Sequence, residues 1–282
     1  MEIDEKEVKL LEARANSVRQ QVVRMIANAG AGHPGGSLSA TDMIVCLYFK
    51  LMNIDPANPD WPDRDRFVLS KGHACPPLYV VLAELGYFPK DHLMTFDHVD
   101  SILQGHPDMT KTPGIDMSTG SLGQGLSAGI GMALGARLRG SDYHTYVMLG
   151  DGELQEGQIW EAAMSAAKFG LDSLTAIVDT NCLQLVDEVK VIMPSCEPSG
   201  GKWRAFGWNV LEMNGHDTRQ ILTVLDQARR HIGTPTVVIA HTVKGKGVSF
   251  MEHNVAWHSR GLTPEELTQA LRDLNETGGL TS

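Results

Sequence analysis

Cysteine is scarce in this sequence, and the few cysteines are not spaced as metal ligands or as a redox pair. The chain has 282 residues and four cysteines, Cys46, Cys75, Cys182 and Cys196, none of them in a C-x-x-C motif. Neither a zinc ribbon nor a redox-active dithiol is therefore indicated. We expect free thiols, which is the usual state of cysteine in a reducing cytosol.

Positive charge is also in short supply. Lysine and arginine number 24 against 34 aspartates and glutamates, so the net charge is −10. This balance argues against a general surface for nucleic acid or for anionic membranes, and neither partner is expected. A phosphate-bearing ligand would have to be bound locally, by helix ends, backbone N–H groups, histidines or a metal ion.

Long apolar runs are missing as well. No stretch approaches the ~20 apolar residues that a membrane-spanning helix needs. The N-terminal stretch MEIDEKEVKLLEARA is charged where a secretory signal would be apolar. These absences predict a soluble, cytoplasmic protein.

Short apolar segments separated by helix-length segments are what the sequence does contain. This alternation is typical of a parallel sheet covered on both faces, so we predict a three-layer α/β/α fold with a mostly parallel sheet. The predicted strands are residues 66–70, 146–149, 174–179, 208–214 and 236–242. The predicted helices include residues 4–28, 40–52 and 263–275, together with a helix that ends near 85.

No linker or repeat divides the chain. We predict one domain over residues 1–282, with N-terminal helices and loops in 1–60, the α/β core in 61–262 and a C-terminal helix and tail in 263–282. The glycine-rich stretch NAGAGHPGGSLSATD, residues 28–42, is predicted to be a loop up to the start of the second helix. The polar tail ETGGLTS is expected to be loose.

Asp151 and Asn181 follow two successive predicted strands, in the stretches GDG and DTN. A right-handed strand–helix–strand crossover brings both loops to the carboxyl edge of a parallel sheet, so the two side chains can reach the same space. Carboxylate and carboxamide oxygens are hard ligands suited to Mg²⁺ or Ca²⁺. Because two ligands do not complete an octahedron, we expect a diphosphate-bearing ligand to supply further oxygens to the metal. The alternative is that the loops of Asp151 and Asn181 are only two ordinary turns.

Three glycine-flanked loops carry histidines: GHPGGS with His33, SKGHACP with His73 and QGHPD with His106. A single histidine is usually an ordinary surface side chain or a hydrogen-bonded side chain of the core. Neutral imidazoles, however, can donate to phosphate and sugar oxygens and move protons near neutral pH. The three loops together therefore favour a binding site.

A predicted helix within residues 120–138 contains an unusual number of glycines: Gly125, Gly129, Gly131 and Gly135. Each interior glycine costs a helix roughly 1 kcal/mol relative to alanine, so a close approach should offset that cost. Packing on the protein's own sheet and contact with a flat ligand or another subunit remain equally open explanations. Lys244 and Lys246 in VKGKG are predicted to lie in a solvated loop, with contact to a phosphate as the lesser alternative.

Taken in order, GHPG, SKGHA, QGHP, TGSLGQG, GDGELQEG and IVDTN resemble the thiamine-diphosphate-binding region of transketolases. The resemblance covers about residues 16–257 and is greatest to the N-terminal subunit of split transketolases, in which two chains make one enzyme. It implies a diphosphate-type thiamine-diphosphate-binding domain. It also implies transfer of a two-carbon ketol unit from a ketose phosphate to an aldose phosphate.

The resemblance implies roles for twelve residues. Asp151, Asn181 and the backbone carbonyl of Leu183 would hold Mg²⁺ or Ca²⁺. Thiamine diphosphate would be contacted by His73 and Gly152 at its diphosphate, by Gly120 and Leu122 at its aminopyrimidine, and by Leu185 at its rings, with Asn181 beside them. Catalytic roles would fall to His33, His106 and His258 near the thiazolium carbon and substrate hydroxyls, and to Glu156 in an acidic network between paired sites.

The sequence departs from the family pattern at three places. Thr180-Asn181-Cys182 stands where N-N-K or D-N-K is common, Val186-Asp187 where split subunits read D-G, and His258-Ser259-Arg260-Gly261 where H-G-x-A-P is usual. The first change keeps the implied metal ligand and loses the neighbouring lysine. These departures put the role of His258 most in question.

In the family, the glutamate that activates the cofactor comes from a second, pyrimidine-binding domain. The resemblance therefore implies a partner, the C-terminal transketolase subunit that carries this domain, and self-association into a dimer of heterodimers. The expected substrates are sugar phosphates.

Two alternatives remain open on the sequence. One is a subunit of another thiamine-diphosphate enzyme, such as a 2-oxo acid dehydrogenase or a deoxyxylulose-phosphate-synthase-like protein. The other is a non-catalytic cofactor-binding paralogue.

Overall fold

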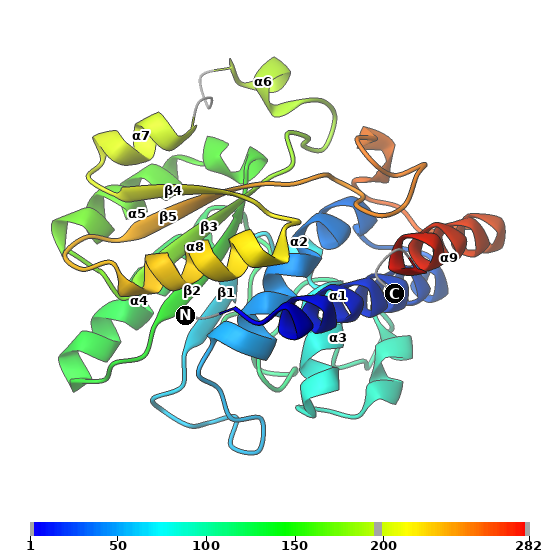
Figure 1. Cartoon of the computed structure of the whole chain (residues 1–282), viewed down its shortest axis with the longest axis horizontal. Coiled ribbons are helices and arrows are strands. Elements are labelled where there is room, and N and C mark those ends of the chain that lie inside the picture. The colour runs from blue at the N-terminus through cyan, green and yellow to red at the C-terminus, as the bar shows by residue number, and fades with distance from the viewer. Residues whose placement is uncertain (1–2, 195–198, 280–282) are drawn as a thin grey trace.

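The computed structural model describes residues 3–194 and 199–279. A five-stranded, fully parallel sheet of order β1-β2-β3-β5-β4 lies at the centre (Figure 1). The strands are β1 Arg66–Leu69, β2 Thr145–Gly150, β3 Leu174–Thr180, β4 Asn209–Asn214 and β5 Thr236–His241. The predicted α/β fold with a parallel sheet is confirmed, and each predicted strand agrees with an observed one to within a residue at either end.

Alternate side chains of the strands point into two separate cores, because successive residues of a strand face opposite sides of the sheet. Tyr146 and Met148 of β2 belong to one core, and Val147 and Leu149 belong to the other. The first core is covered by α1 Glu5–Ala29, α2 Pro34–Cys46, α3 Pro76–Leu85, α8 Thr218–Arg230 and α9 Pro264–Gly279. The second is covered by α4 Gln124–Arg139, α5 Gly157–Lys168 and α7 Ser199–Ala205.

Short helical turns connect these elements. They comprise a π-helical turn at Leu47–Leu51, the short helix α6 Val189–Ile192, and 3₁₀ turns at Gly72–Ala74, Lys90–Thr95, Gly152–Gln155 and Val255–Trp257. Within the described ranges, no helix is long and apolar enough to cross a membrane.

The start of α2 was predicted wrongly. The helix begins at Pro34, inside the stretch predicted to be a loop, with His33 at the N-cap. Proline is favoured at the first helical position, since its fixed φ suits the helix and its missing N–H is not needed there. Gly35 is required by packing, because a Cβ at this position would lie 2.8 Å from the carbonyl oxygen of Trp257. The cost of glycine in a helix is thus offset by a close contact between α2 and the chain near Trp257.

The C-terminal helix is longer than predicted. It continues through Gly279, so part of the stretch expected to be loose is helical, and residues 280–282 lie outside the described part. Cys46, Cys75 and Cys182 form no disulfide among the described residues, and Cys196 lies outside them.

The glycines of α4 divide between two faces of the helix. A Cβ on Gly125 would collide with the side chain of Ser70, and one on Gly129 would collide with Cγ2 of Val147. A Cβ on Gly131 would meet nothing within 4 Å. Packing on the protein's own sheet therefore explains Gly125 and Gly129, whereas Gly131 faces away from it.

Candidate functional site

A cavity of about 430 Å³ lies at the carboxyl ends of β1, β2, β3 and β5. This is the edge at which ligands bind in open parallel sheets. All twelve residues that the sequence assigned to a site line this cavity: His33, His73, His106, Gly120, Leu122, Asp151, Gly152, Glu156, Asn181, Leu183, Leu185 and His258. Their individual roles stay predictions.

Asp151 and Asn181 lie close together, as the crossover argument requires. Oδ2 of Asp151 accepts a hydrogen bond of 2.5 Å from the backbone N–H of Cys182, the residue after Asn181. Oδ1 of Asp151 accepts another from the N–H of Gly152 at 2.8 Å. Burial first, and then the charge of Asp179, raise the pKa of Asp151 to about 7. A nearby cation would stabilise this carboxylate in its ionised form.

The local donor set consists of hard oxygen atoms. Asn181 Oδ1 accepts a hydrogen bond from the N–H of Leu183 at 3.2 Å, and the carbonyl of Leu183 accepts one from Nζ of Lys244 at 3.1 Å. No cluster of three or more His, Cys, Asp or Glu suited to a metal occurs in the described ranges. Any metal here would therefore use one carboxylate, amide and backbone oxygens, and oxygens of a bound ligand, which fits Mg²⁺ or Ca²⁺.

Four histidines from separate loops meet in the cavity. The ring of His33 lies 5.1 Å from that of His73, 6.1 Å from that of His106 and 5.6 Å from that of His258, measured between centroids. His73 and His258 are 5.4 Å apart. His258, the least secure prediction, therefore lies beside the other three despite the altered sequence after it.

Three of these imidazoles, those of His33, His73 and His258, are held in the neutral form. Burial, followed by the charge of His106, lowers the pKa of His33 to about 4. Burial and Lys244 lower the pKa of His258 to about 3, and burial and Lys71 lower that of His73 well below its usual value. Neutral imidazoles can both donate to and accept from the hydroxyl groups of a ligand.

Two buried lysines complete the cavity. Sequence reasoning did not single out Lys71, and for Lys244 it gave contact with a phosphate only as the lesser alternative to a solvated loop. Lys71 and Lys244 are each only 2% exposed. Lys71 forms an ion pair with Asp179 and donates to the carbonyl of Gly36 at 3.1 Å. Lys244 contacts Nδ1 of His258 at 2.9 Å, and burial together with the charge of Lys71 lowers its pKa to about 8.

The prediction of a solvated loop is therefore wrong for Lys244. The lysine closely follows the end of β5, and its amine contacts the carbonyl of Leu183 and Nδ1 of His258. The backbone beside it is closely packed, since Gly245 has a φ of 80° and an added Cβ there would collide with the carbonyl group of Met251. The position of Lys244 after a strand at the carboxyl edge was the signal that could have found it.

Three helices point their N-termini at this region without a side-chain cap. The N-caps of α2, α4 and α5 are His33, Gly123 and Glu156, and none makes a side-chain capping hydrogen bond. The first N–H groups of a helix carry partial positive charge and bind anions when no side chain satisfies them. Together with Lys71 and Lys244, they make the cavity suitable for an anionic group such as a diphosphate.

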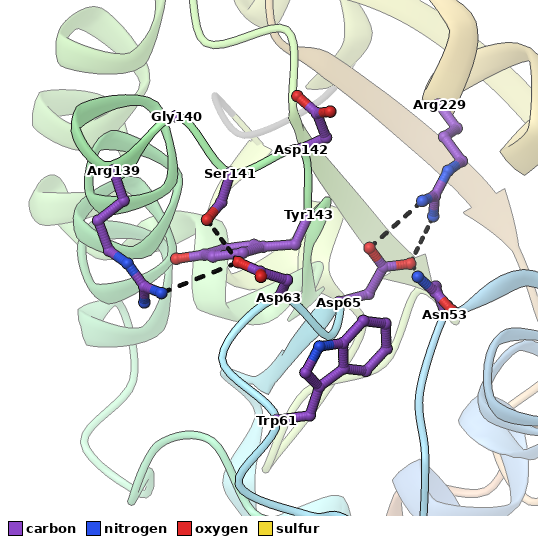
Figure 2. A pocket seen from close by; sticks show the side chains of 10 residues that line it. All are labelled: Asn53, Trp61, Asp63, Asp65, Arg139, Gly140, Ser141, Asp142, Tyr143 and Arg229. Carbon is purple, nitrogen blue, oxygen red and sulfur yellow. Dashed lines mark hydrogen bonds and ion pairs between the residues drawn. The ribbon is translucent and has the colours of Figure 1, made fainter.

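A second hollow, of about 550 Å³, lies at the opposite edge of the sheet beside the residues that precede β1 and β2 (Figure 2). Several of its polar side chains pair with one another: Arg229 with Asp65, and both Arg139 and Ser141 with Asp63 (Figure 2). Both arginines of this hollow are therefore already paired with carboxylates.

Residues 11–276 match the family model described as "Transketolase, thiamine diphosphate binding domain". The chain is 47% identical to the 6-deoxy-6-sulfo-D-fructose transketolase subunit SqwG of Clostridium sp. (strain MSTE9), covering 95% of this chain and 97% of that protein. It is 42% identical to an apulose-4-phosphate transketolase subunit of Phocaeicola vulgatus, covering 96% of this chain and 95% of that protein.

Longer relatives are matched over part of their length. The chain is 36% identical to human transketolase, with 96% of this chain and 43% of that protein covered. A crystal structure of transketolase from Campylobacter jejuni superimposes with a TM-score of 0.89 at 32% identity, over 99% of this chain and 43% of the other. The chain belongs to the transketolase family and corresponds to its thiamine-diphosphate-binding domain.

Proposed function

We propose that this chain is the N-terminal subunit of a two-chain transketolase that transfers a two-carbon ketol unit from a ketose phosphate to an aldose phosphate. The observation that carries the proposal is the single cavity in which Asp151, Asn181, four histidines and two buried lysines meet. SqwG and the apulose-4-phosphate transketolase subunit of Phocaeicola vulgatus, which match over nearly their whole length, support it.

The residues present fit thiamine diphosphate and a divalent ion. Asp151, Asn181 and the carbonyl of Leu183 would hold Mg²⁺ or Ca²⁺. Lys244, His73 and the N–H of Gly152 would hold the diphosphate, and Gly120, Leu122 and Leu185 would line the rings. When bound, thiamine diphosphate supplies an electron sink for the carbon from which the ketol unit is cleaved.

The histidines of this chain would orient the sugar and handle its protons. His33, His106 and His258 come from separate loops and are close enough to contact neighbouring hydroxyl groups of one substrate. Since His33 and His258 are neutral near pH 7, each can accept a proton from a hydroxyl or donate a hydrogen bond to it. Glu156, at the N-cap of α5, would join the acidic network toward a second site.

A partner subunit would complete the enzyme. The chain covers 43% of human transketolase, and its relatives of similar length are named as subunits. We infer that the partner carries the pyrimidine-binding domain and that two such pairs associate as a dimer of heterodimers. We further propose that residues 1–282 act as one cofactor-binding unit, that the enzyme is cytoplasmic, and that its substrates are sugar phosphates or related sugar acids such as sulfonates.

The test is turnover with purified subunits. We expect ketol transfer from fructose 6-phosphate, 6-deoxy-6-sulfo-D-fructose or apulose 4-phosphate to an aldose phosphate only when this chain and its partner are combined with thiamine diphosphate and Mg²⁺. Sustained transfer by this chain alone would contradict the proposed division of labour. Turnover of pyruvate in place of sugars would indicate another thiamine-diphosphate enzyme, and cofactor binding without any turnover would indicate a non-catalytic paralogue.

A further inference from the structure

Glu153 lies beneath the cavity with its carboxylate surrounded by hydrogen-bond donors. The residue belongs to the 3₁₀ turn Gly152–Gln155 and is 2% exposed. Its Oε1 accepts hydrogen bonds from Oγ of Ser70 and, at 2.8 Å, from the backbone N–H of Gly123. Its Oε2 accepts one from the backbone N–H of Gly150 at 2.9 Å. Among the described residues, Glu153 forms no ion pair, so neutral donors alone satisfy this buried carboxylate.

The three donors come from three different segments that border the cavity. Ser70 directly follows β1, Gly150 is the last residue of β2, and Gly123 is the N-cap of α4. Gly123 ends the loop that carries Gly120 and Leu122 into the cavity. One side chain therefore joins this loop to the ends of two strands.

The junction is too tightly packed for the loop to take another position at no cost. Gly123 has a φ of 87°, and a Cβ there would lie 2.8 Å from Cβ of Glu156. A Cβ on the nearby Gly125 would collide with the side chain of Ser70. The loop, the N-terminus of α4 and the end of β1 are thus in direct contact around the Glu153 carboxylate.

We propose that Glu153 is a positioning residue that fixes the Gly120–Gly123 loop relative to the ends of β1 and β2. On the proposed function, that loop lines the aminopyrimidine while the end of β2 lies beside the diphosphate. Glu153 then sets the distance between the parts of the site that hold the two ends of thiamine diphosphate. A carboxylate is needed for this, because both of its oxygens accept, whereas a glutamine would turn an NH₂ group toward one of the donors.

The test separates the two ends of the cofactor by using two ligands. Binding of thiamine diphosphate with Mg²⁺ and binding of inorganic pyrophosphate with Mg²⁺ are measured by calorimetry on the full chain combined with its partner subunit. We expect Glu153→Gln to raise the Kd for thiamine diphosphate about tenfold or more, and to leave the Kd for pyrophosphate within about twofold. The matched control is Glu161→Gln on the exposed side of α5, which should leave both unchanged.

A second variant tests the positioning role of Glu153 if Glu153→Gln fails to fold. Ser70→Ala removes one donor to the same carboxylate and should raise the Kd for thiamine diphosphate about threefold. In the double variant the two effects should combine less than multiplicatively, because both act through one carboxylate.

Two results would overturn the inference about Glu153. The first is an unchanged Kd for thiamine diphosphate in Glu153→Gln, or in Ser70→Ala if Glu153→Gln is unfolded. The second is an equal loss of affinity for thiamine diphosphate and for pyrophosphate, which a general structural defect would cause. If the wild-type chain combined with its partner subunit binds pyrophosphate but not thiamine diphosphate, the proposed function fails, and the inference fails with it. This outcome is recognised from the wild type alone, before any variant is compared.

Discussion

Asp151 and Cys182 are joined by a hydrogen bond of 2.5 Å from the backbone N–H of Cys182 to the Asp151 carboxylate. The bond ties the loop after β2 to the loop after β3, with Cys182 in the left-handed region at a φ of 67°. Asp151 is 4% exposed and lies near the charge of Asp179. The buried carboxylate is therefore poorly compensated within the described residues, and a divalent cation with a diphosphate would compensate it.

The first prediction concerns this pair of loops. Asp151→Ala and Asn181→Ala should each weaken binding of thiamine diphosphate in the presence of Mg²⁺ by about 100-fold, which corresponds to about 2.8 kcal/mol. Calorimetry with and without Mg²⁺ measures the change. Undiminished affinity in both variants would mean that these residues do not bind the metal.

The location of Asp151 and Asn181 could be predicted because it follows from chain topology alone. Parallel strands joined by a right-handed crossover deliver their following loops to one edge, whatever the packing details. The histidine loops could be found because glycine-flanked histidines are unusual in sequence. The distances between these histidines could not be predicted from the sequence. Nor could the neutral state of His33 and His258, since it follows from burial, which is a property of the assembled loops.

Lys244 and the start of α2 show where sequence reasoning failed. A lysine in a glycine-rich loop is usually solvated, but Lys244 is buried and contacts the carbonyl of Leu183 and Nδ1 of His258. Glycines after His33 usually indicate a loop, yet Gly35 lies in a helix, where the close approach of Trp257 leaves no room for a side chain. In both cases a contact distant in sequence overrides the local preference of the residues, and no local pattern records such contacts.

The second prediction concerns the buried ion pair between Lys71 and Asp179, whose side chains are 2% and 0% exposed. Asp179 also accepts a hydrogen bond from Oγ of Ser39 at 2.6 Å. Lys71→Met should lower the free energy of unfolding by about 3 kcal/mol or more, because it leaves a buried carboxylate without its partner. Urea denaturation measures this loss.

The control for that prediction is an exposed pair. Lys190→Met breaks the surface pair with Glu188, whose side chains are 71% and 43% exposed, and should change stability by less than about 0.5 kcal/mol. Adding Asp179→Asn to Lys71→Met should recover part of the loss. Equal effects of the two lysine substitutions would show that burial of the Lys71–Asp179 pair contributes nothing.

The third prediction is a pH dependence that arises from Asp42. Burial alone would raise its pKa, but the charge of Arg19 and the hydrogen bond from His216 outweigh burial and lower it from 3.8 to about 2. The carboxylate therefore stabilises the fold fully above pH 3.8, and the contribution is lost as the pH falls toward 2. Its size is about 2 kcal/mol, from a shift of nearly two pKa units.

Asp42→Asn tests this dependence. The variant should be less stable than the wild type by about 2 kcal/mol at pH 7, and the difference should shrink between pH 4 and pH 2. Urea denaturation at pH 7, 5, 4 and 3 provides the comparison. A difference that stayed constant over this range would mean that the loss comes from altered packing and not from the ionised carboxylate.

The fourth prediction uses two glycines of α4 that differ only in what faces them. Gly129→Ala should destabilise the fold by about 1–3 kcal/mol, since the new Cβ would collide with Val147 in the closely packed core. Gly131→Ala should stabilise the isolated chain by up to about 1 kcal/mol, because the site is open and alanine is the better helix former. The two variants carry the same substitution two residues apart, and their thermal unfolding measures the expected loss of stability in one and the expected gain in the other. If Gly131→Ala leaves the isolated chain stable but weakens assembly with its partner subunit, the open face of α4 is a subunit interface. Contact with another subunit would then explain Gly131, whereas packing on the protein's own sheet explains Gly129.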